Sequence, residues 1–289
     1  MELAKMRRRF AREMLAIGGV TGNERLENAF AHVPREKFLG PGRWHILTPW
    51  SHLNVDERDP ALVYQDVVIA LDEDRGVNNG SPSLHARWLD AVAPQPGERV
   101  AHIGAGTGYY SAILAELVEA EGHVTAVDYD PGCAGRAKEN LANRANVDVV
   151  QDNGCFWPKE KSDVVYVNFG IPRPAVPWIE NLNPGGRLIF PLGVPSSASS
   201  RGGAMNAITI AVRRLDSGFA AWSGCPVSFI FAEGLTPAPG NDEIKNLSHC
   251  LRKGGWERVK SLVWKQPADR AHCWYVGPDW ALSYIAVAA

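Results

Sequence analysis

The sequence contains 289 residues, of which 45% are hydrophobic and 21% are charged, and its formal net charge is −2. This length accommodates one large α/β domain with an appendage, or two modest domains, and the near-balanced charge excludes a general attraction to nucleic acid or to an anionic membrane. No run of about 18 apolar residues is present to cross a membrane, and five scattered cysteines without a CxxC pair predict a reduced, cytoplasmic protein.

Residues 1–80 predict two helices followed by irregular structure. The helices are RRRFAREMLAIGGV and NERLENAFAHV, and Pro34 closes the second. Residues 41–80 are rich in Gly, Pro, Trp and Asn and contain one strand-like run, YQDVVIAL. This composition is typical of loops that build a site. We therefore expect residues 1–80 to form an N-terminal segment of helices and substrate-contacting loops.

Residues 81–234 predict a doubly wound α/β domain. After the helix SLHARWLDAV, short apolar strands alternate with helices, as in βαβ units. The expected strands are 99–103, 123–129, 147–152 and 162–169, then RLIFPLG, AITIAVRRL and VSFIFA; the expected helices are 109–119, 132–144 and 176–182, the last followed by a turn at NPGG. Seven such strands predict a mostly parallel, Rossmann-like sheet with helices on both faces.

Residues 235–289 predict an added C-terminal α+β segment. They begin with a Pro/Gly linker and continue with a helix near 241–252. Three strand-like segments follow, carrying Trp256, Trp264, Trp274 and Trp280. Because tryptophan is ordinary strand and core material, we expect plain packing here, with a lid or a dimer face as the alternative.

The stretch IGAGTGYYSAILAEL joins the first expected strand of the sheet to the next helix, with glycines at 104, 106 and 108. Glycines at the carboxyl edge of a sheet let the main chain, with free N–H groups, touch a nucleotide-like ligand. The dinucleotide pattern needs a glycine where this chain has Tyr109, and a P-loop needs a Lys-Ser/Thr pair that is absent. A ligand with amino and carboxylate groups and no phosphates fits this loop, which indicates S-adenosylmethionine.

Polar residues at the ends of the next two strands support the same ligand. Asp128 ends the second strand, where an acidic side chain can accept hydrogen bonds from both ribose hydroxyls. Tyr129 is expected against the adenine, and Asp152 and Asn153 are expected near the adenine amino group. The glycine loop, the ribose acid and the adenine-side acid together predict a nucleoside site, the alternative being tight turns and a solvated aspartate.

Longer motifs, spread over residues 20–234, resemble the protein-L-isoaspartate O-methyltransferases within the class I methyltransferases. HVPREKFLGPG resembles the family's VPRE-F segment, YQD resembles its Y-x-D, and NNGSPSLHA resembles its T-I-S-x-P segment. QDNGCFWP, NPGGRLIFPLG and VSFIFAEG are similar to its D-G-x-x-G-W-P, P-G-G-R-L-x-x-P-x-G and closing F-V-P-L-x-G segments.

The resemblance implies a class I methyltransferase fold and an enzyme that uses S-adenosyl-L-methionine to methylate a side-chain carboxylate of a protein or peptide, as in isoaspartate repair. It implies that Tyr64, Asp66 and Ser81 form the catalytic set, the first two near the substrate mouth. The cofactor-binding residues it implies are Asn79, Ser81, His85, Gly104, Ala105, Gly106, Thr107, Gly108, Tyr109, Asp128, Tyr129, Asp152 and Asn153.

The sequence departs from the family mainly on the acceptor side. The serine of T-I-S-x-P falls on Gly80, so its hydroxyl has moved to Ser81 or Ser83. The acidic residue two before the first loop glycine is His102, and the glycine of the D-G pair is Asn153. Cofactor binding is expected to survive these changes, whereas the acceptor could be a small molecule or a specific peptide, methylated on oxygen or nitrogen.

A carboxylate acceptor needs no general base, because its reference pKa of about 4 leaves it ionised at neutral pH. An amine or alcohol would need one, and His85 or His102 would be the candidate, although packing or cofactor contact is the expected role of both. The pairs His249–Cys250 and His272–Cys273 match no zinc spacing, so no metal is expected. A cofactor-binding protein without catalysis is a further alternative.

Overall fold

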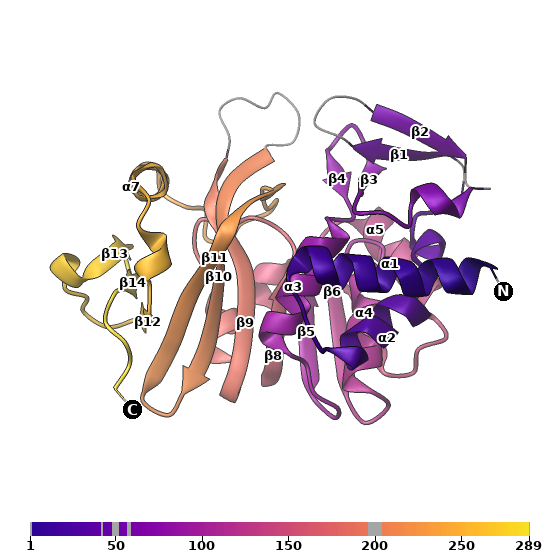
Figure 1. The fold of residues 1–289 in the computed structure, drawn as a ribbon. Coiled ribbons are helices and arrows are strands. Elements are labelled where there is room, and N and C mark those ends of the chain that lie inside the picture. The colour runs from indigo at the N-terminus through magenta and orange to yellow at the C-terminus, as the bar shows by residue number, and fades with distance from the viewer. Residues whose placement is uncertain (1, 42, 48–51, 57–58, 196–203, 289) are drawn as a thin grey trace. The chain divides into compact units, whose positions relative to one another are not determined.

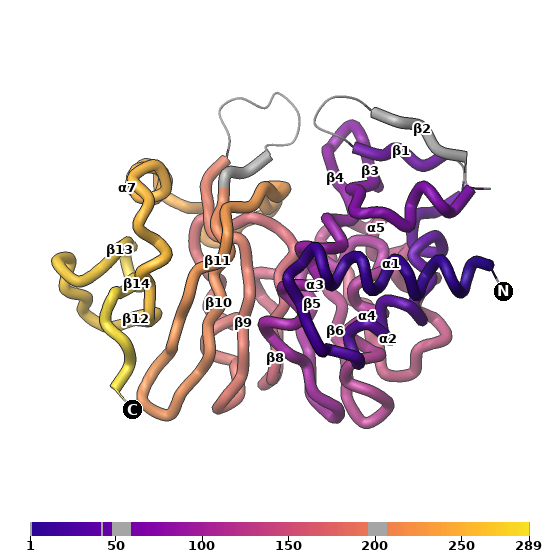
Figure 2. The backbone as a smooth tube through the Cα atoms, in the orientation of Figure 1, coloured from indigo at the N-terminus to yellow at the C-terminus, as the bar shows by residue number. Residues whose placement is uncertain are grey.

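The computed structural model describes residues 2–41, 43–47, 52–56, 59–195 and 204–288, with backbone only for 52–56 and 204–206. The chain forms two compact units, Met1–Asp152 and Asn153–Ala289. Figure 1 labels the helices and strands of each unit, and Figure 2 traces the backbone through them.

The first unit contains N-terminal helices, a small antiparallel sheet and three parallel strands (Figure 1). In chain order its elements are α1 (Glu2–Gly18), α2 (Glu24–His32), η1 (Arg35–Phe38), β1 (Arg43–Leu47), β2 (His52–Asp56), η2 (Pro60–Leu62), β3 (Val68–Asp72), β4 (Val77–Asn78), α3 (Pro82–Val92), β5 (Arg99–Ile103), α4 (Tyr109–Val118), β6 (His123–Asp128), α5 (Pro131–Leu141) and β7 (Val147–Gln151).

The two N-terminal helices confirm the prediction, and each buries one apolar face. In α1, Phe10, Met14 and Leu15 are buried, at spacings that place them on one side of a helix. That side packs against α2 and α3 (Figure 1). Asn23 caps α2, because its side-chain oxygen accepts a hydrogen bond from the Leu26 N–H at 3.0 Å.

Strands β1 to β4 form a small antiparallel sheet in the order β2-β1-β3-β4. Strand β3 overlaps the predicted run YQDVVIAL and confirms it. Strands β1, β2 and β4 lie where residues 41–80 were expected to be irregular, and for these three strands that prediction is wrong. Trp44 and Ile46 are buried while the other residues of β1 are less covered, which is the two-residue period of a strand with one covered face. The three missed strands are two to five residues long, so their alternating pattern is too short to be recognised among the surrounding Gly, Pro and Trp residues.

Strands β5, β6 and β7 pair in parallel and are connected by α4 and α5, which confirms the predicted βαβ alternation. Val100, Ile103, Val124 and Val127 are at most 2% exposed and form the core of this sheet. Nearly every residue of α4 is buried as well. A helix covered all round needs no polar face, which explains the uninterrupted apolar run after the glycine loop.

The second unit contains η3 (Gly154–Phe156), β8 (Ser162–Val167), α6 (Val176–Glu180), β9 (Leu182–Pro195), β10 (Ala204–Leu215), β11 (Gly218–Ile230), α7 (Asn241–Lys253), η4 (Trp256–Arg258), β12 (Ser261–Trp264), η5 (Arg270–His272), β13 (Cys273–Val276) and β14 (Trp280–Ser283). Its strand order is β13-β14-β12-β11-β10-β9-β8. Strands β8 and β9 are parallel, and the other described pairs are antiparallel.

Strands β5 to β11 are the seven that the sequence predicts, and the α/β fold class is confirmed. One local prediction is wrong: NPGG is not a turn before β9 but lies inside it. The register of β9 against β8 shifts between Ser162 and Val164, and Gly185 has φ 76°. These are features of a bulge, which bends a strand without reversing it.

The C-terminal segment has the predicted α+β character. Strand β12 continues the sheet beyond β11, with Phe219 opposite Leu262, and β14 and β13 follow. Trp256 lies in the short helix η4, so its predicted place in a strand is wrong. Trp274 and Trp280 are 6% and 2% exposed, as expected for core residues.

The predicted domain boundaries at 80/81 and 234/235 stay a prediction. The division between the two compact units falls at 152/153, inside the predicted central domain. No helix in the described part of the chain is both long and apolar enough to cross a membrane.

Candidate functional site

The loop between β5 and α4 depends on glycine at three positions. Gly104, Gly106 and Gly108 have φ values of 78°, 57° and 93°, a region that side chains disfavour. A Cβ on Gly108 would lie 2.7 Å from Leu141 Cδ1, so this glycine lets α5 approach the loop. A Cβ on Gly106 would meet Leu71 Cδ1 at 3.5 Å, an ordinary contact. Internal packing therefore accounts for Gly108, and backbone conformation for the other two.

The backbone N–H groups of this loop are engaged inside the protein. The N–H groups of Gly104 and Ala105 donate to Val127 O at 2.8 and 3.1 Å. The Gly106 N–H donates to Asp128 Oδ2 at 2.7 Å. The expectation that these groups are free for a ligand is wrong, because the loop uses them to fasten itself to β6. A ligand would meet the glycine surfaces and the carbonyl oxygens of the loop.

Asp128 stands at the carboxyl end of β6, half buried. Its Oδ2 accepts the Gly106 N–H, and its Oδ1 accepts the Asp130 N–H at 2.9 Å. Burial raises the pKa of the Asp128 carboxyl to about 6, and these two hydrogen bonds oppose the rise. Each oxygen keeps a second lone pair for a further donor, as a ribose site requires. The neighbouring Tyr129 ring is 48% exposed, which suits the predicted contact with adenine.

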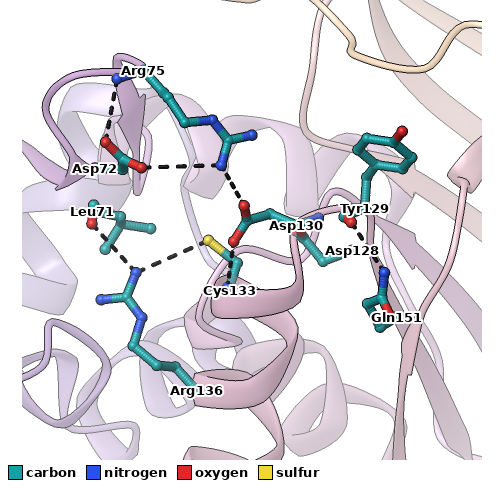
Figure 3. A network of polar contacts seen from close by, with 9 residues as sticks. All are labelled: Leu71, Asp72, Arg75, Asp128, Tyr129, Asp130, Cys133, Arg136 and Gln151. Carbon is teal, nitrogen blue, oxygen red and sulfur yellow. Dashed lines mark hydrogen bonds and ion pairs between the residues drawn. The ribbon is translucent and has the colours of Figure 1, made fainter.

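A polar network joins the β3–β4 hairpin to the start of α5 (Figure 3). Arg75 forms an ion pair with Asp130 and lies 4.0 Å from Asp72. Arg136 reaches back from α5 and donates to Leu71 O at 3.3 Å. Leu71 also lies beside the glycine loop, since a Cβ on Gly106 would meet its Cδ1 at 3.5 Å, so these contacts place the hairpin next to the loop.

The predicted catalytic residues Asp66 and Ser81 are brought together, with Ser83 as a third member. Ser81 Oγ donates to Asp66 Oδ1 at 2.9 Å, and Ser83 Oγ donates to Oδ2 at 2.5 Å. The two hydroxyl oxygens are 3.2 Å apart. Ser81 also caps α3 by accepting the Leu84 N–H. Asp66 is exposed, Ser81 half buried and Ser83 buried, so the cluster extends inward from the surface.

Arg35, in the VPRE segment, holds the backbone around Asp66. It is fully buried, and its Nη1 donates to the carbonyls of Val63 and Gln65 at 2.6 and 3.1 Å, while Nη2 donates to that of Val67 at 2.6 Å. Burial lowers the pKa of Arg35, and the nearby Asp66 carboxylate opposes this shift. The guanidinium therefore fixes the loop and balances the charge of its aspartate.

Tyr64 does not lie open at a substrate mouth. Its side chain is 4% exposed, and its hydroxyl donates to Glu36 and accepts from Arg7 Nε at 3.0 Å. Burial and the Glu36 carboxylate raise the pKa of Tyr64 well above its ordinary value. In this structure the ring fastens the loop to α1 and η1, which corrects the expected position and leaves a catalytic role for Tyr64 without support.

Gly80 and His85 are sterically linked. Gly80 has φ 72°, and a Cβ there would lie 2.4 Å from His85 Nε2. The imidazole is 1% exposed and stacks on Tyr110, with 3.6 Å between ring centroids. A serine hydroxyl at position 80 would therefore require His85 to move. The hydroxyls at 81 and 83 are the ones that this packing permits.

Both candidate histidine bases are buried and neutral. Burial lowers the pKa of His85 well below its ordinary value, and the charge of Arg35 contributes to the shift. Burial lowers the pKa of His102 to about 3, and its Nδ1 is hydrogen-bonded to Ser111 Oγ at 2.7 Å. A general base works best with a pKa near the operating pH, so neither ring suits that role.

The remaining predicted cofactor residues divide by environment. Thr107 donates to Phe38 O at 2.6 Å and is buried, which makes it a support of the loop. Tyr109 is 3% exposed, and its hydroxyl has no partner among the residues described. Asn79 accepts the Ile69 N–H at 2.9 Å, while its amide nitrogen lacks an acceptor within the described residues. Asp152 directly follows β7, and its backbone N–H donates to Asp128 O at the end of β6.

Asn153 opens the second unit. Its Oδ1 accepts the Cys155 N–H at 2.9 Å, and its Nδ2 donates to Gly234 O at 2.6 Å. Both ends of the amide are therefore used to cap η3 and to hold the start of the C-terminal segment. The predicted contact of this side chain with adenine stays a prediction.

Three residues of the site were not predicted: Arg35, Arg75 and Asp130. Asp130 precedes Pro131, the pair that commonly starts a helix, and it accepts the Cys133 N–H at 2.7 Å as the cap of α5. That signal was available in the sequence. Nothing local in the sequence pairs Arg75 with Asp130, or Arg35 with three carbonyls thirty residues away. Within the described residues, no group of three His, Cys, Asp or Glu side chains could hold a metal ion.

Comparison with known proteins bears directly on this site. The family model for protein-L-isoaspartate(D-aspartate) O-methyltransferase matches residues 12–201. A protein-L-isoaspartate O-methyltransferase of Aeropyrum pernix is 34% identical over 188 residues, which are 63% of this chain and 65% of that protein. The corresponding protein of Methanopyrus kandleri is 29% identical over 194 residues, 65% of this chain and 77% of its own length.

Solved structures agree on the fold. A protein-L-isoaspartate O-methyltransferase superimposes with a TM-score of 0.61 at 25% identity, covering 84% of this chain and 68% of its own. A Plasmodium falciparum structure described as the same kind of enzyme, in complex with S-adenosyl-L-homocysteine, gives a TM-score of 0.60 at 14% identity, covering 79% and 99%. The fold is thus that of the class I methyltransferases. The chain belongs to the protein-L-isoaspartate(D-aspartate) O-methyltransferase family.

Proposed function

We propose that this chain is an S-adenosylmethionine-dependent methyltransferase that forms a methyl ester on a side-chain carboxylate of a protein or peptide. Family membership supports the proposal. The observation that carries it is the half-buried Asp128 carboxylate at the end of β6, joined to the glycine loop through Gly106 and followed by the exposed Tyr129 ring. The matched region spans 65% of the Aeropyrum pernix relative, so the activity and substrate of that whole protein are proposals for this chain.

The residues at this strand end fit an adenosine that carries an amino-acid tail. The donors that Asp128 now accepts are backbone N–H groups, and two hydroxyls would add donors that favour its ionised form. The exposed face of Tyr129 can stack on a purine. Carbonyl oxygens of the loop can accept from an ammonium group. When bound, S-adenosylmethionine supplies a methyl group on a positively charged sulfur.

We assign the acceptor to the cluster of Asp66, Ser81 and Ser83. A second carboxylate would be repelled by Asp66 alone, but Arg35 balances that charge from below. Ser81 and Ser83 would orient an acceptor carboxylate by turning their O–H groups from Asp66 toward it, because each hydroxyl has one proton to donate. Because the acceptor is already ionised, no base is needed, in keeping with the two neutral histidines. Alignment and exclusion of water would supply most of the catalysis.

A second candidate function follows from Gly80. The packing of His85 bars a side chain at position 80, where the resembled family has serine, and the hydroxyls stand one and three residues further on. This displacement favours an acceptor other than an isoaspartyl residue, namely a different carboxylate on a specific peptide or a small molecule.

The test is methyl transfer to paired peptides. The protein is incubated with methyl-labelled S-adenosylmethionine and either an isoaspartyl peptide or its aspartyl twin, and base-labile methanol is counted. Release from either peptide supports ester formation on a side-chain carboxylate. Release from the isoaspartyl peptide alone assigns the acceptor to isoaspartyl residues, and release from the aspartyl twin supports the second candidate. Methyl transfer only to amines, as base-stable label, would contradict ester formation.

Two variants test whether the Ser81 and Ser83 hydroxyls contact the acceptor. Ser83→Ala removes a hydroxyl that caps nothing, whereas Ser81→Ala also removes the cap of α3 and is expected to cost about 1 kcal/mol of folding free energy. If the acceptor lies at this cluster, Ser83→Ala lowers the rate. Loss of its hydrogen bond to Asp66 is also expected to cost about 1 kcal/mol of folding free energy, which melting temperatures measure separately. An unchanged rate in both variants would show that the acceptor does not bind at this cluster.

We further propose a cytoplasmic protein acting on protein or peptide substrates and organised as an N-terminal acceptor segment, a central cofactor domain and a C-terminal extension. All five cysteines are free, which supports a reducing compartment. The near-balanced net charge supports a polypeptide rather than a nucleic acid as partner.

A further inference from the structure

The second unit contains a cavity of about 320 Å³ that lies outside the residues assigned to methyl transfer. Small-molecule sites commonly measure roughly 300–1,000 Å³. The cavity is lined by η3, residues 171–177, the linker at 235–239 and the facing ends of β12 and β14 (labelled in Figure 1). The C-terminal extension therefore supplies part of the wall.

Aromatic side chains form one side of the cavity. Trp264 and Trp280 line it, and they are directly opposed residues of the β12–β14 pair, so their side chains share one face of the sheet. Phe156 and Val176 also line it and are 45% and 41% exposed. Large apolar side chains left open around a cavity are typical of a binding site.

The two charged side chains of the cavity's described lining differ in their exposure. Arg173 and Asp279 are the charged members of its described lining. Arg173 Nε is paired with Glu243 Oε1 at 2.9 Å, and the Glu243 side chain is 6% exposed, so the guanidinium is already neutralised from behind. Asp279 Oδ1 lies 3.4 Å from Arg173 Nη2, and its side chain is 44% exposed. Asp279 is therefore the more exposed charge of the lining, since the Arg173 side chain is 21% exposed and is shared with the buried Glu243.

Lysines near the aromatic rings do not belong to the lining. Lys265 Nζ lies 5.9 Å from the centre of the Trp264 ring and is bonded to Glu180 at 2.5 Å. Lys159 Nζ lies 5.7 Å from the centre of the Phe156 ring. Both rings therefore already face a cation on one side, which is the interaction that their electron-rich faces favour.

The rest of the wall is apolar and stiff. Five prolines contribute to it, at positions 172, 174, 177, 237 and 239. Proline fixes its own φ, so walls of this kind lose little freedom when a ligand binds. An apolar stem would be buried against these rings and methylene groups.

We propose that this cavity binds a small organic cation with an apolar stem, of the alkylammonium class. The cationic head would lie against Asp279 and the tryptophan faces, and the stem would lie against the prolines. An anion would instead meet a like charge at Asp279, the more exposed charge of the lining, while Arg173 is already shared between two carboxylates. The same chemistry is offered by a free alkylammonium ion and by a lysine side chain of a polypeptide.

The experiment is a calorimetric titration of the full chain with n-butylammonium, with butan-1-ol as the neutral analogue. We expect saturable binding of the cation in the millimolar range or tighter, and weaker binding of the alcohol. Asp279→Asn and Trp264→Leu are each expected to weaken cation binding by about fivefold. Asp242→Asn, an exposed carboxylate on α7 outside the lining, should leave it unchanged.

Equal affinity for butan-1-ol and n-butylammonium would overturn the proposal, as would unchanged affinity in a folded Asp279→Asn protein or no binding at all. Melting temperatures show whether each variant is folded. A parallel titration with N-acetyl-lysine methylamide separates the two sources. Tighter binding of this compound assigns the site to a polypeptide side chain, and binding of butylammonium alone assigns it to a free ion; both support the cation site.

Discussion

The Asp128 carboxyl is half buried, accepts two backbone hydrogen bonds and has its pKa raised to about 6. Its ordinary value in an unfolded chain is about 3.9. The folded protein therefore holds this proton more tightly, so Asp128 makes folding less favourable as pH rises from about 4 to 6 and adds no further change above that range. Burial of this carboxylate costs stability, as is common for groups retained for binding.

Ligand binding should show the opposite pH dependence. Hydroxyl donors favour the ionised carboxylate, so the affinity for S-adenosylhomocysteine is expected to rise with pH and level off above 7. At pH 5, with the carboxylate about one-tenth ionised, the dissociation constant should be about tenfold larger than at pH 7. Equilibrium dialysis across this range measures it.

The matched variants for that series are Asp128→Asn and Asp148→Asn, the second an exposed carboxylate on β7. Asp128→Asn should bind weakly with no pH dependence between 5 and 7, and Asp148→Asn should follow the wild type. A wild-type affinity that is flat over this range would show that Asp128 does not contact the ligand. The groups that act on Asp128 besides its backbone donors are Asp130, which raises its pKa, and Arg75, which lowers it.

Gly80 provides a steric prediction. Gly80→Ser should lower the free energy of unfolding by about 2 to 4 kcal/mol, since it adds a clash with His85 to the strain of a left-handed backbone. Gly76→Ser is the control, because Gly76 has φ 68° and nothing within 4 Å of the added Cβ. Urea unfolding of both variants isolates the clash. Equal losses in the two would mean that His85 yields easily and that position 80 is free to carry a hydroxyl.

At the scale of elements, the loop at residues 63–67 depends on Arg35. Arg35→Met should remove the guanidinium donors of the Val63 and Val67 carbonyls and cost about 2 kcal/mol or more. The Gln65 carbonyl keeps the Val67 N–H as a donor at 2.8 Å. Arg9→Met, on the exposed face of α1, should cost little. Hydrogen exchange in residues 63–67 should accelerate more than the exchange in β5 to β7. Uniform acceleration across the unit would show that Arg35 supports global stability rather than this loop.

The elements that the sequence predicts well are those whose pattern is long enough to be unambiguous. Helices α1 to α5 and strands β5 to β7 have clear periods, and their positions are confirmed within a few residues. Of the small sheet, β3 was predicted, whereas β1, β2 and β4 were missed because they are short and lie in a glycine- and proline-rich stretch. The turn predicted at NPGG failed because β8 supplies a partner that carries β9 through the bulge, which the local residues do not reveal.

For the candidate site too, local sequence patterns do not reveal contacts between distant parts of the chain. The glycine conformation and the Asp128 position could be predicted from spacing and motif, and the family resemblance implied the grouping of Asp66 with Ser81. Tyr64 was placed wrongly because the partners that bury it, Arg7 and Glu36, come from distant parts of the chain. The N–H groups of Gly104, Ala105 and Gly106 that were expected to be free are bonded to Val127 and Asp128, which lie on the neighbouring parallel strand β6.

For the second unit of the molecule, the extension matters to stability as well as to the proposed cavity. A chain ending at residue 234 would lose the pairing of β11 with β12 and the buried residues Leu262, Trp280 and Leu282. The edge of β11 would then be open to pairing with other chains. We expect the shortened chain to melt at a lower temperature and to aggregate, which light scattering during heating would detect. A shortened chain that is monomeric and equally stable would make the extension a separate module.

The central claim is that the strand end at Asp128 and the adjoining glycine loop bind the sulfonium nucleoside. Calorimetric titration with S-adenosyl-L-homocysteine tests it most directly, in the wild type, in Asp128→Ala and in Asp148→Ala. We predict one binding site per chain, a dissociation constant at least about 100-fold larger in Asp128→Ala, and no change in Asp148→Ala. Absence of heat with the wild type, or equal affinity in Asp128→Ala, would contradict the claim.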